Sequence, residues 1–198
     1  MRLYHSPTTP FGRKVMVLLL ETGLTDRVEV VAVSGTPVAP GTMPVDQNPL
    51  GKIPVLVRDD GMALYDSRVI CRYLDDLAGA GLYGAGDALW QTLTLEATAD
   101  GILDAAILMV YEARIRPEDK RFDDWVEGQW AKVQRSLDMV EQRAMGPLDM
   151  GQIALACALA YLDFRHDARN WRQGRPRLAA WNAEMAVRPS LQATRPPV

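Results

Sequence analysis

Hydroxyl side chains gather near the start of the chain, where they could bind a ligand. Ser6, Thr8 and Thr9 lie in the stretch SPTTPFGRKV, directly before an apolar run that predicts a helix. Most Ser and Thr residues in that position cap the helix, because their side-chain oxygen accepts a hydrogen bond from a free backbone N–H. The alternative is that a ligand is bound beside these hydroxyls and the first turn of the helix.

Two later stretches could also bind a ligand, although each has an ordinary structural explanation. In NPLGKIPVL, residues 48–56, Pro54 opens a strand directly after a turn. Only about 5–6% of X–Pro bonds in folded proteins are cis, so this bond alone indicates nothing unusual. Asp66 and Ser67 begin a predicted helix, where free N–H groups and the helix dipole favour an anion. An ordinary helix cap is the commoner outcome for such a pair.

The first 77 residues predict short strands and helices in quick succession, which is typical of a small mixed domain. Gly23 ends the first predicted helix, and Asp59-Asp60-Gly61 predicts a hairpin turn. The predicted strands are 3–5, 27–33, 54–57 and 62–65, and the predicted helices are 11–22 and 67–77. The order of elements is therefore β-α-β followed by β-β-α.

The rest of the chain predicts helices only. A Gly-rich stretch at 79–86 has no periodicity and indicates a linker, and Asp149 with Gln152 predicts a capping box. The predicted helices are 88–115, 123–143, 150–163 and 177–187. We therefore predict a first domain at 1–77, a linker at 78–87 and an all-helical domain at 88–198.

The composition of the chain excludes several classes of function. A hydrophobic content of 48% over 198 residues is enough for real cores. The net charge of −3 gives no electrostatic footprint for nucleic acid or anionic lipid. No run approaches the roughly 18 apolar residues of a membrane span, and the N-terminus lacks the pattern of a secretion signal. We predict a cytoplasmic protein that binds no nucleic acid and no membrane.

The cysteines and histidines predict packing rather than chemistry. Cys71 and Cys157 lie far apart, each within an apolar helical pattern, and have too few partners for a metal site. His5 ends a predicted strand and His166 follows a helix, and neither has a visible catalytic partner. We therefore predict that no metal is bound.

Together, three motifs resemble the glutathione site of the glutathione transferase family. They are Thr-Pro-Phe at 9–11, Ile-Pro-Val-Leu at 53–56 and Asp-Ser at 66–67. The resemblance covers the entire chain, and the helix at 153–163 is similar to that of a bacterial branch. It implies the glutathione transferase fold, which is an α/β, thioredoxin-like N-terminal domain followed by an all-α C-terminal domain, in a cytoplasmic homodimer.

The resemblance also assigns roles in binding glutathione. Ile53 would bind the cysteinyl part through its backbone, held open by a cis bond to Pro54. Ser67 would bind the γ-glutamyl carboxylate through its hydroxyl and N–H, and Asp66 would lie near the amino group. Lys52 would balance charge near the other end of the peptide, although a solvated lysine is an almost equally good interpretation.

Thr9 occupies the position at which relatives place the residue that faces the glutathione sulfur. Some relatives have Ser there and others Cys, and a cysteine would form mixed disulfides. A hydroxyl can only donate a hydrogen bond to the thiolate. The threonine is a departure from the family pattern, because its methyl group restricts the rotamer of the hydroxyl. Ser6, Thr8 and Tyr4 therefore stay open as alternative donors.

The resemblance implies a glutathione transferase that activates the thiol for attack on a small electrophile, a peroxide or a disulfide, as in detoxification. The alternative is a non-catalytic glutathione-binding or scaffold protein with the same fold. The second substrate is expected against the first long helix, around Met109, Glu112 and Arg116. Asp100 lies where some relatives reach the glutathione of the neighbouring subunit, the alternative being a simple exposed helix residue.

Overall fold

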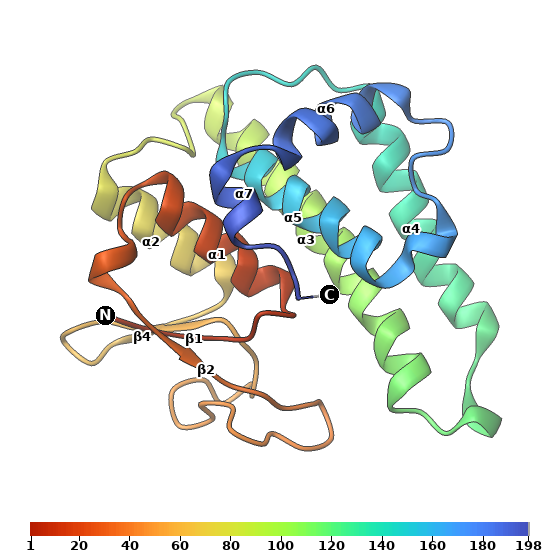
Figure 1. The fold of residues 1–198 in the computed structure, drawn as a ribbon, viewed down its shortest axis with the longest axis horizontal. Coiled ribbons are helices and arrows are strands. Elements are labelled where there is room, and N and C mark those ends of the chain that lie inside the picture. The colour runs from red at the N-terminus through yellow and green to blue at the C-terminus, as the bar shows by residue number, and fades with distance from the viewer. Residues whose placement is uncertain (198) are drawn as a thin grey trace. The chain divides into compact units, whose positions relative to one another are not determined.

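The computed structural model describes residues 1–197 as two compact units. The first comprises Met1–Ala85 and the residues from Pro189 onward, and the second comprises Gly86–Arg188. The elements of the first unit are β1 (Arg2–His5), α1 (Pro10–Glu21), η1 (Thr25–Arg27), β2 (Glu29–Ala32), β3 (Val55–Val57), β4 (Ala63–Leu64), α2 (Ser67–Ala78) and α7 (Pro189–Ala193) (Figure 1). The predicted order, β-α-β followed by β-β-α, is confirmed.

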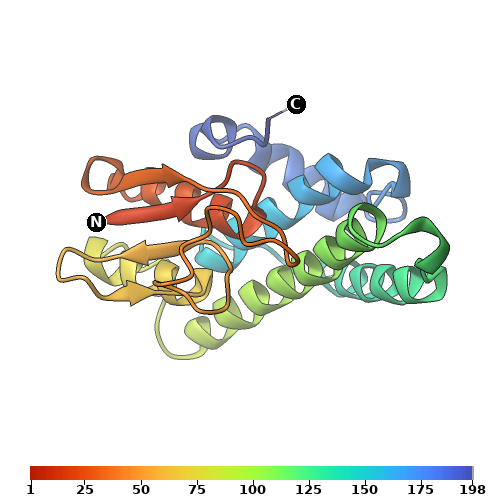
Figure 2. The same ribbon diagram turned by 90° about the horizontal axis from the view of Figure 1, so that it is seen from below.

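The four strands form one mixed sheet in the order β2-β1-β3-β4 (Figure 2). β1 runs parallel to β2 and antiparallel to β3, and β3 runs antiparallel to β4. Successive side chains of a strand point to opposite faces, so Leu3 and His5 share the buried face of β1, while Arg2 and Tyr4 face the other way. α1 and α2 pack against each other, and Gly12 of α1 lies on the His5 ring.

The register of the sheet brings three segments of the chain to one end of it. Tyr4 lies opposite Val55, so the chain leaves β1 where it enters β3. Leu56 lies opposite Leu64, so the chain leaves β4 at the same end. Because α1 and α2 follow β1 and β4, both helices begin here. We call this the helix-start end of the sheet.

α1 connects the C-terminal segment to the first unit. Its apolar residues Val15 and Leu18 are fully buried, as the sequence predicts, but Arg13 is buried too, with 5% of its surface exposed. The Arg13 guanidinium donates hydrogen bonds to the Leu191 carbonyl at 3.0 Å and to the Thr194 hydroxyl at 3.3 Å. These bonds hold α7 against the helix that begins at the helix-start end.

The C-terminal segment departs from the predicted division into domains. The sequence analysis assigns it to the helical domain and predicts no helix there, whereas the residues from Pro189 onward pack with the first unit and include α7. The Ser190 hydroxyl bonds to the Glu21 carboxylate near the other end of α1. A five-residue helix has too little periodicity to be seen in the sequence, and its partners lie far away along the chain.

The second unit is helical. Its elements are α3 (Asp87–Arg114), η2 (Glu118–Lys120), α4 (Asp123–Glu141), α5 (Met150–His166), η3 (Asp167–Arg169) and α6 (Pro176–Ala186). α5 packs closely on α3, and Gly151 permits this approach. A Cβ on Gly151 would lie 2.8 Å from the Thr92 carbonyl oxygen and 2.9 Å from the Leu95 Cβ.

Only one of the two hydrogen bonds of the predicted capping box of α5 is present. The Asp149 carboxylate accepts the Gln152 backbone N–H at 2.7 Å, which confirms the cap. The Gln152 side chain, however, donates to the carbonyls of Gly146 and Pro147 rather than binding the Asp149 backbone. It thereby fixes the turn that precedes α5.

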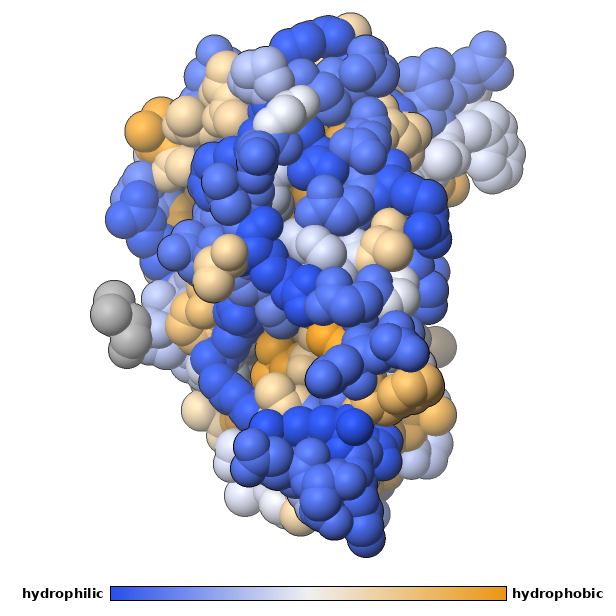
Figure 3. All heavy atoms as spheres, turned by 90° about the vertical axis from the view of Figure 1, so that its right-hand side faces the viewer, coloured by the Kyte–Doolittle hydropathy of each residue, from blue (hydrophilic) through white to orange (hydrophobic). Residues whose placement is uncertain are grey.

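The exposed surface carries scattered hydrophobic residues. Large apolar side chains with more than half their surface exposed in the helical unit are Trp90, Phe122 and Val187. The face drawn in Figure 3 is largely hydrophilic, with hydrophobic residues in small patches. Among the described residues, no helix combines the length and hydrophobicity that crossing a bilayer requires.

We expect Arg13→Met to lower the free energy of unfolding by about 1.5–3 kcal/mol, because methionine keeps an apolar stem but loses the charge-assisted bonds to the C-terminal segment. Urea unfolding at neutral pH measures this change. Arg2→Met is the matched control, since the Arg2–Glu29 pair is exposed and screened by solvent, so its loss should change the stability little. Equal losses of stability in the two variants would show that the bonds from Arg13 to the C-terminal segment do not stabilise the fold.

Candidate functional site

Thr9 is the N-cap residue of α1, yet its side chain does not cap the helix. Its backbone is extended, with φ −88° and ψ 121°, and the hydroxyl makes no capping hydrogen bond. At the corresponding positions of α2 and α5, the carboxylates of Asp66 and Asp149 do accept such bonds. Ordinary capping therefore does not account for Thr9, whose half-buried hydroxyl is left for another partner.

Ser6 and Thr8 build the turn that carries Thr9. Their hydroxyl oxygens lie 3.3 Å apart and share a hydrogen bond. The Thr9 backbone N–H donates to the Ser6 carbonyl at 3.0 Å, which closes the turn between β1 and α1. The tight loop predicted here is present, and within it the Ser6 and Thr8 hydroxyls already have each other as partners.

Asn48 fixes the second loop at the helix-start end, a role that the sequence analysis missed. It is 2% exposed, and its side-chain amide donates to the Lys52 carbonyl at 2.8 Å and accepts the Leu50 backbone N–H at 3.1 Å. The Asn48 carbonyl also accepts the Gly51 N–H at 2.9 Å. The signal was the turn-forming Asn-Pro pair that opens this loop.

Ile53 presents a free stretch of main chain next to β3. The Ile53–Pro54 bond is cis, as the resemblance implies. Within the part of the chain that the structure describes, neither the backbone N–H nor the carbonyl of Ile53 takes part in a hydrogen bond. The neighbouring Lys52 is exposed. The loop can therefore pair with an extended peptide through its backbone.

Asp66 and Ser67 begin α2 at the same end of the sheet. Asp66 Oδ1 accepts the Arg68 backbone N–H at 3.0 Å, and its Oδ2 accepts the Arg68 guanidinium at 2.8 Å. Burial raises the pKa of the Asp66 carboxyl, but the bonds from Arg68 and the charges of Arg68 and Lys14 outweigh it and hold the pKa below its usual value. Ser67 is 2% exposed. The Tyr65–Asp66 bond is also cis, which the sequence did not predict.

Two residues to which the sequence assigned no role, His5 and Gly12, lie close to Thr9. His5 is 9% exposed, and burial lowers the pKa of its imidazole to about 4. A Cβ on Gly12 would lie 2.2 Å from His5 Nδ1 and 2.7 Å from the Thr9 methyl carbon. Gly12 is thus required by the close approach of ring and methyl, and the spacing of His5, Thr9 and Gly12 gave no such signal.

The helix-start end can attract an anionic ligand mainly through backbone groups rather than through side chains. Two helix N-termini meet there, and each presents free N–H groups and the positive end of its dipole. Lys14 is fully buried on α1 and adds a positive charge that acts on Asp66. Among the described residues, no group of three or more His, Cys, Asp or Glu side chains is arranged to hold a metal ion.

Two family models match the chain. They are described as Glutathione S-transferase, N-terminal domain, over residues 8–77, and Glutathione S-transferase, C-terminal domain, over residues 123–183. The chain belongs to the glutathione S-transferase family. The family predicted from the three motifs is confirmed, and so is the glutathione transferase fold class. All three motifs of the predicted glutathione site lie in or beside the helix-start end of the first unit.

Similar proteins cover nearly all of this chain. The uncharacterized GST-like protein YibF of Escherichia coli (strain K12) is 35% identical over 205 residues, which is 100% of this chain and 99% of YibF. A glutathione transferase family member from Pseudomonas fluorescens Pf-5, with bound glutathione, is 49% identical with a TM-score of 0.96, over 100% of this chain and 99% of that one. A second structure from the same organism, with bound S-(propanoic acid)-glutathione, is 48% identical with a TM-score of 0.92, over 100% of both chains.

The residues that the family resemblance assigns to a second substrate are mostly engaged within the helical unit. Glu112 is buried, and its carboxylate accepts bonds from the Arg116 side chain at 2.8 Å and the Phe122 N–H at 3.0 Å. Met109 is 5% exposed. Asp100 is 6% exposed, so its interpretation as a simple exposed helix residue is wrong.

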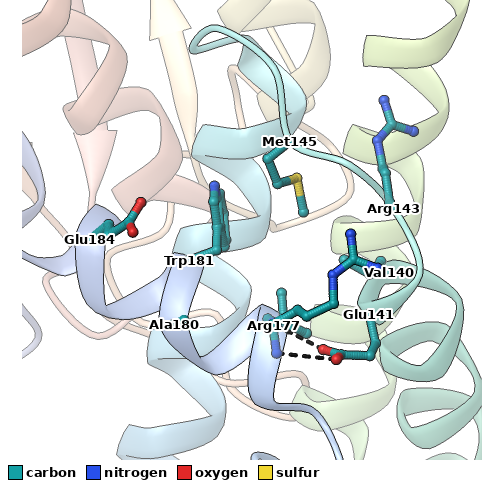
Figure 4. Close-up of a pocket in the computed structure, with 9 residues that line it drawn as sticks. Val140, Glu141, Arg143, Met145, Arg177, Ala180, Trp181 and Glu184 are labelled. Atoms are coloured by element: carbon teal, nitrogen blue, oxygen red, sulfur yellow. Dashed lines mark hydrogen bonds between the residues drawn. The ribbon is translucent and has the colours of Figure 1, made fainter.

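A separate hollow of about 280 Å³ lies within the helical unit (Figure 4). There the Glu141 carboxylate accepts the backbone N–H groups of Arg177 at 3.1 Å and Leu178 at 2.7 Å, and so caps α6 from α4. The lining residues are Val140, Glu141, Arg143, Met145, Arg177, Leu178, Ala180, Trp181 and Glu184. None of them belongs to the predicted glutathione site, and the hollow's buried acid already serves as a helix cap.

The buried imidazole of His5 predicts a loss of stability in mild acid. Its pKa is about 4 in the folded protein and about 6.5 in the unfolded chain, so the unfolded state binds the proton first. The free energy of unfolding is unaffected above about pH 6.5 and falls between about pH 6.5 and pH 4, by up to about 3 kcal/mol. Denaturant unfolding across this range, compared between the wild type and His5→Asn, measures the effect.

The comparison isolates His5 because other groups titrate alike in both proteins. Burial also lowers the pKa of His166, the second histidine, and its contribution cancels in the difference. The stability of His5→Asn relative to the wild type should rise as the pH falls. Parallel pH profiles for the two proteins would show that His5 is not buried in its neutral form.

Proposed function

We propose that this protein is a glutathione transferase that binds glutathione at the helix-start end and stabilises its thiolate through Thr9. The observation that carries the proposal is the Thr9 hydroxyl, which stands at the N-terminus of α1 without a capping bond. The glutathione bound by the relative from Pseudomonas fluorescens Pf-5, which is 49% identical, supports the choice of ligand. We propose that the protein acts as a homodimer.

The first step is binding of the peptide by backbone groups and helix starts. The main chain of Ile53 pairs with the cysteinyl part, as in the addition of a strand to a sheet. The Ser67 hydroxyl and N–H bind the γ-glutamyl carboxylate, where the start of α2 attracts negative charge. The Asp66 carboxylate, with half of its side chain exposed, accepts from the amino group, and Lys52 balances charge at the glycyl end.

The second step is ionisation of the thiol. With a reference pKa of about 8.5, only about 3% of a thiol is ionised at about pH 7, and lowering the pKa by about two units requires roughly 2.7 kcal/mol. A hydrogen bond from the Thr9 hydroxyl to the thiolate contributes about 1.5–3 kcal/mol. The N-terminus of α1 adds about 0.3–1 kcal/mol. Together these two terms contribute about 1.8–4 kcal/mol, a range that includes the roughly 2.7 kcal/mol required, and the thiol proton passes to water.

The third step is attack by the thiolate on a small electrophile. A sulfur–carbon bond forms, and either the leaving group departs with its electron pair, or the electron pair of the substrate's activated double bond moves to the neighbouring carbon, which takes a proton from water. The bound ligand of the 48% identical relative, S-(propanoic acid)-glutathione, carries carbon on its sulfur. That ligand supports conjugation over reduction of a peroxide or a disulfide. A non-catalytic glutathione-binding protein is the alternative that the following experiments test.

We expect Ser67→Ala to weaken glutathione binding by about ten- to hundredfold, because a charge-assisted hydrogen bond contributes about 1.5–3 kcal/mol. Isothermal titration calorimetry at several temperatures measures the affinity. Ser34→Ala is the matched control, since Ser34 is an exposed serine outside the site, and it should bind like the wild type. No heat of binding for the wild type, or equal affinity in Ser67→Ala, would rule out the proposed site.

Thr9→Cys tests whether Thr9 faces the sulfur. A cysteine at the positive end of α1 should have a lowered pKa and react with oxidised glutathione: its thiolate attacks one sulfur, forms a mixed disulfide and releases one glutathione thiolate. Mass spectrometry should find one added glutathione on position 9. Cys71 and Cys157 are internal controls, because both are fully buried and should stay unmodified.

The neighbouring positions complete this test. Ser6→Cys and Thr8→Cys should react more slowly than Thr9→Cys, because both residues precede the helix start and their hydroxyls bond to each other. Activity should also shift from conjugation towards disulfide exchange in Thr9→Cys only. If Ser6→Cys or Thr8→Cys is modified faster, that residue is the thiol contact. If none reacts, the loop does not meet the thiol and the non-catalytic alternative is favoured.

A further inference from the structure

The His5 imidazole is a buried polar group directly behind the Thr9 side chain. Both Nδ1 and the Thr9 methyl carbon approach the bare Cα of Gly12, at 2.2 and 2.7 Å from the place of its missing Cβ, so they lie no more than about 5 Å apart. His5 is the last residue of β1 and shares the buried face of the strand with Leu3. It therefore reaches the start of α1 from within the sheet.

His5 Nδ1 has no hydrogen-bond partner among the described residues. A buried polar atom without a partner costs about 1–3 kcal/mol, and an apolar side chain would fill the same space without that cost. Packing alone therefore does not explain a histidine here. Burial is the only cause that lowers its pKa to about 4, so at neutral pH one ring nitrogen carries a proton and the other is an acceptor.

We propose that His5 is a positioning residue for Thr9. In the glutathione complex, His5 Nδ1–H donates to Thr9 Oγ1, and the Thr9 O–H donates to the thiolate. This inference rests on the proposed function, because it concerns the donor that faces the sulfur. A rotation of about 120° about the Cα–Cβ bond of Thr9 moves Oγ1 to the position of the methyl group, on the side of Nδ1, and moves the methyl group to the position of Hβ.

The direction of these bonds follows from what the thiolate requires. If Nδ1 were the acceptor, the Thr9 hydroxyl would donate its one hydrogen bond to Nδ1, and the sulfur would have no donor. With Nδ1 as the donor, the hydroxyl has one fixed direction, and each bond polarises the other, which strengthens such chains by about 10–30% per bond. A neutral ring serves this purpose, and burial keeps His5 neutral throughout the pH range in which the thiol ionises.

Two substitutions separate the hydrogen bond from packing. His5→Phe keeps a planar ring without nitrogen atoms, whereas His5→Asn places an amide N–H near the position of Nδ1. The pKa of bound glutathione is measured from the ultraviolet absorbance of its thiolate as a function of pH. We expect His5→Phe to raise this pKa by about half to one unit, which leaves about 1.5- to threefold less thiolate at about pH 7. His5→Asn should stay within about 0.2 units of the wild type. An unchanged pKa in His5→Phe, or equal shifts in both variants, would overturn the proposal.

Nitrogen-15 NMR of the wild-type protein tests the same bond without a substitution. The chain has only two histidines, and His166 is an internal reference, because its Nε2 lies 3.0 Å from the Ala106 carbonyl oxygen and must carry the proton to donate. In the glutathione complex, His5 should show the opposite form, with the proton on Nδ1. A proton on Nε2 of His5 in the complex would refute the assigned direction.

These outcomes are distinguishable from failure of the proposed function. If glutathione does not bind, calorimetry shows no heat of binding for the wild type, and there is no bound thiol whose pKa Thr9→Val could change. If glutathione binds, and Thr9→Val raises the thiol pKa while His5→Phe does not, Thr9 acts without His5. If both variants raise the pKa and the double variant adds little, the two residues act through one chain of hydrogen bonds.

Discussion

The pairing of β1 with β3 is the constraint on which the rest of the first unit depends. Leu3 and Leu56, which lie opposite each other, are fully buried, so a slip of one residue would turn a whole apolar face of β1 towards water. The register is therefore strongly fixed. Because β3 and β4 form an adjoining hairpin, the same register determines where α2 begins. One set of backbone bonds thus brings the turn before α1, the loop before β3 and the start of α2 to the same end.

The helix-start end needs few charged groups to attract an anion. Its positive potential comes from two helix N-termini and one buried lysine, and the chain as a whole carries a net charge of −3. A helix dipole contributes about 0.3–1 kcal/mol, whereas a hydrogen bond to a charged group contributes about 1.5–3 kcal/mol. Placement of the donor therefore matters more than the general field. Asn48 within its loop and Arg13 behind α1 are buried polar residues that hold this frame rigid.

Thr9 combines a donor with a methyl group that limits the side chain to few rotamers. A serine could rotate freely, whereas the methyl group of Thr9 packs at the contact between His5 and Gly12. The absence of a side chain on Gly12 is what allows the ring and the methyl each to approach it this closely. The same crowding limits the side chain to few arrangements, so the hydroxyl is either directed outward or turned towards the imidazole. A threonine in place of the usual residue is compatible with a precise site when its surroundings are this close.

The sequence by itself determined the features that depend on neighbouring residues: the turns, the helix starts, the order of elements and, through three short motifs, the family. Such features are visible because they need only a few adjacent side chains and a period of two or 3.6 residues. The cis bond at Pro54 followed only from that family resemblance. Only the tertiary structure decided the packing of α7 on α1, the burial of Asp100 and Glu112, and the contact of His5 with Thr9 and Gly12. Burial and hydrogen bonding at these positions depend on residues distant along the chain, so no local pattern records them. Three-dimensional packing decides which polar groups lie near a buried atom. For this reason the strand-end residue His5, to which the sequence assigned no role, enters the proposed site.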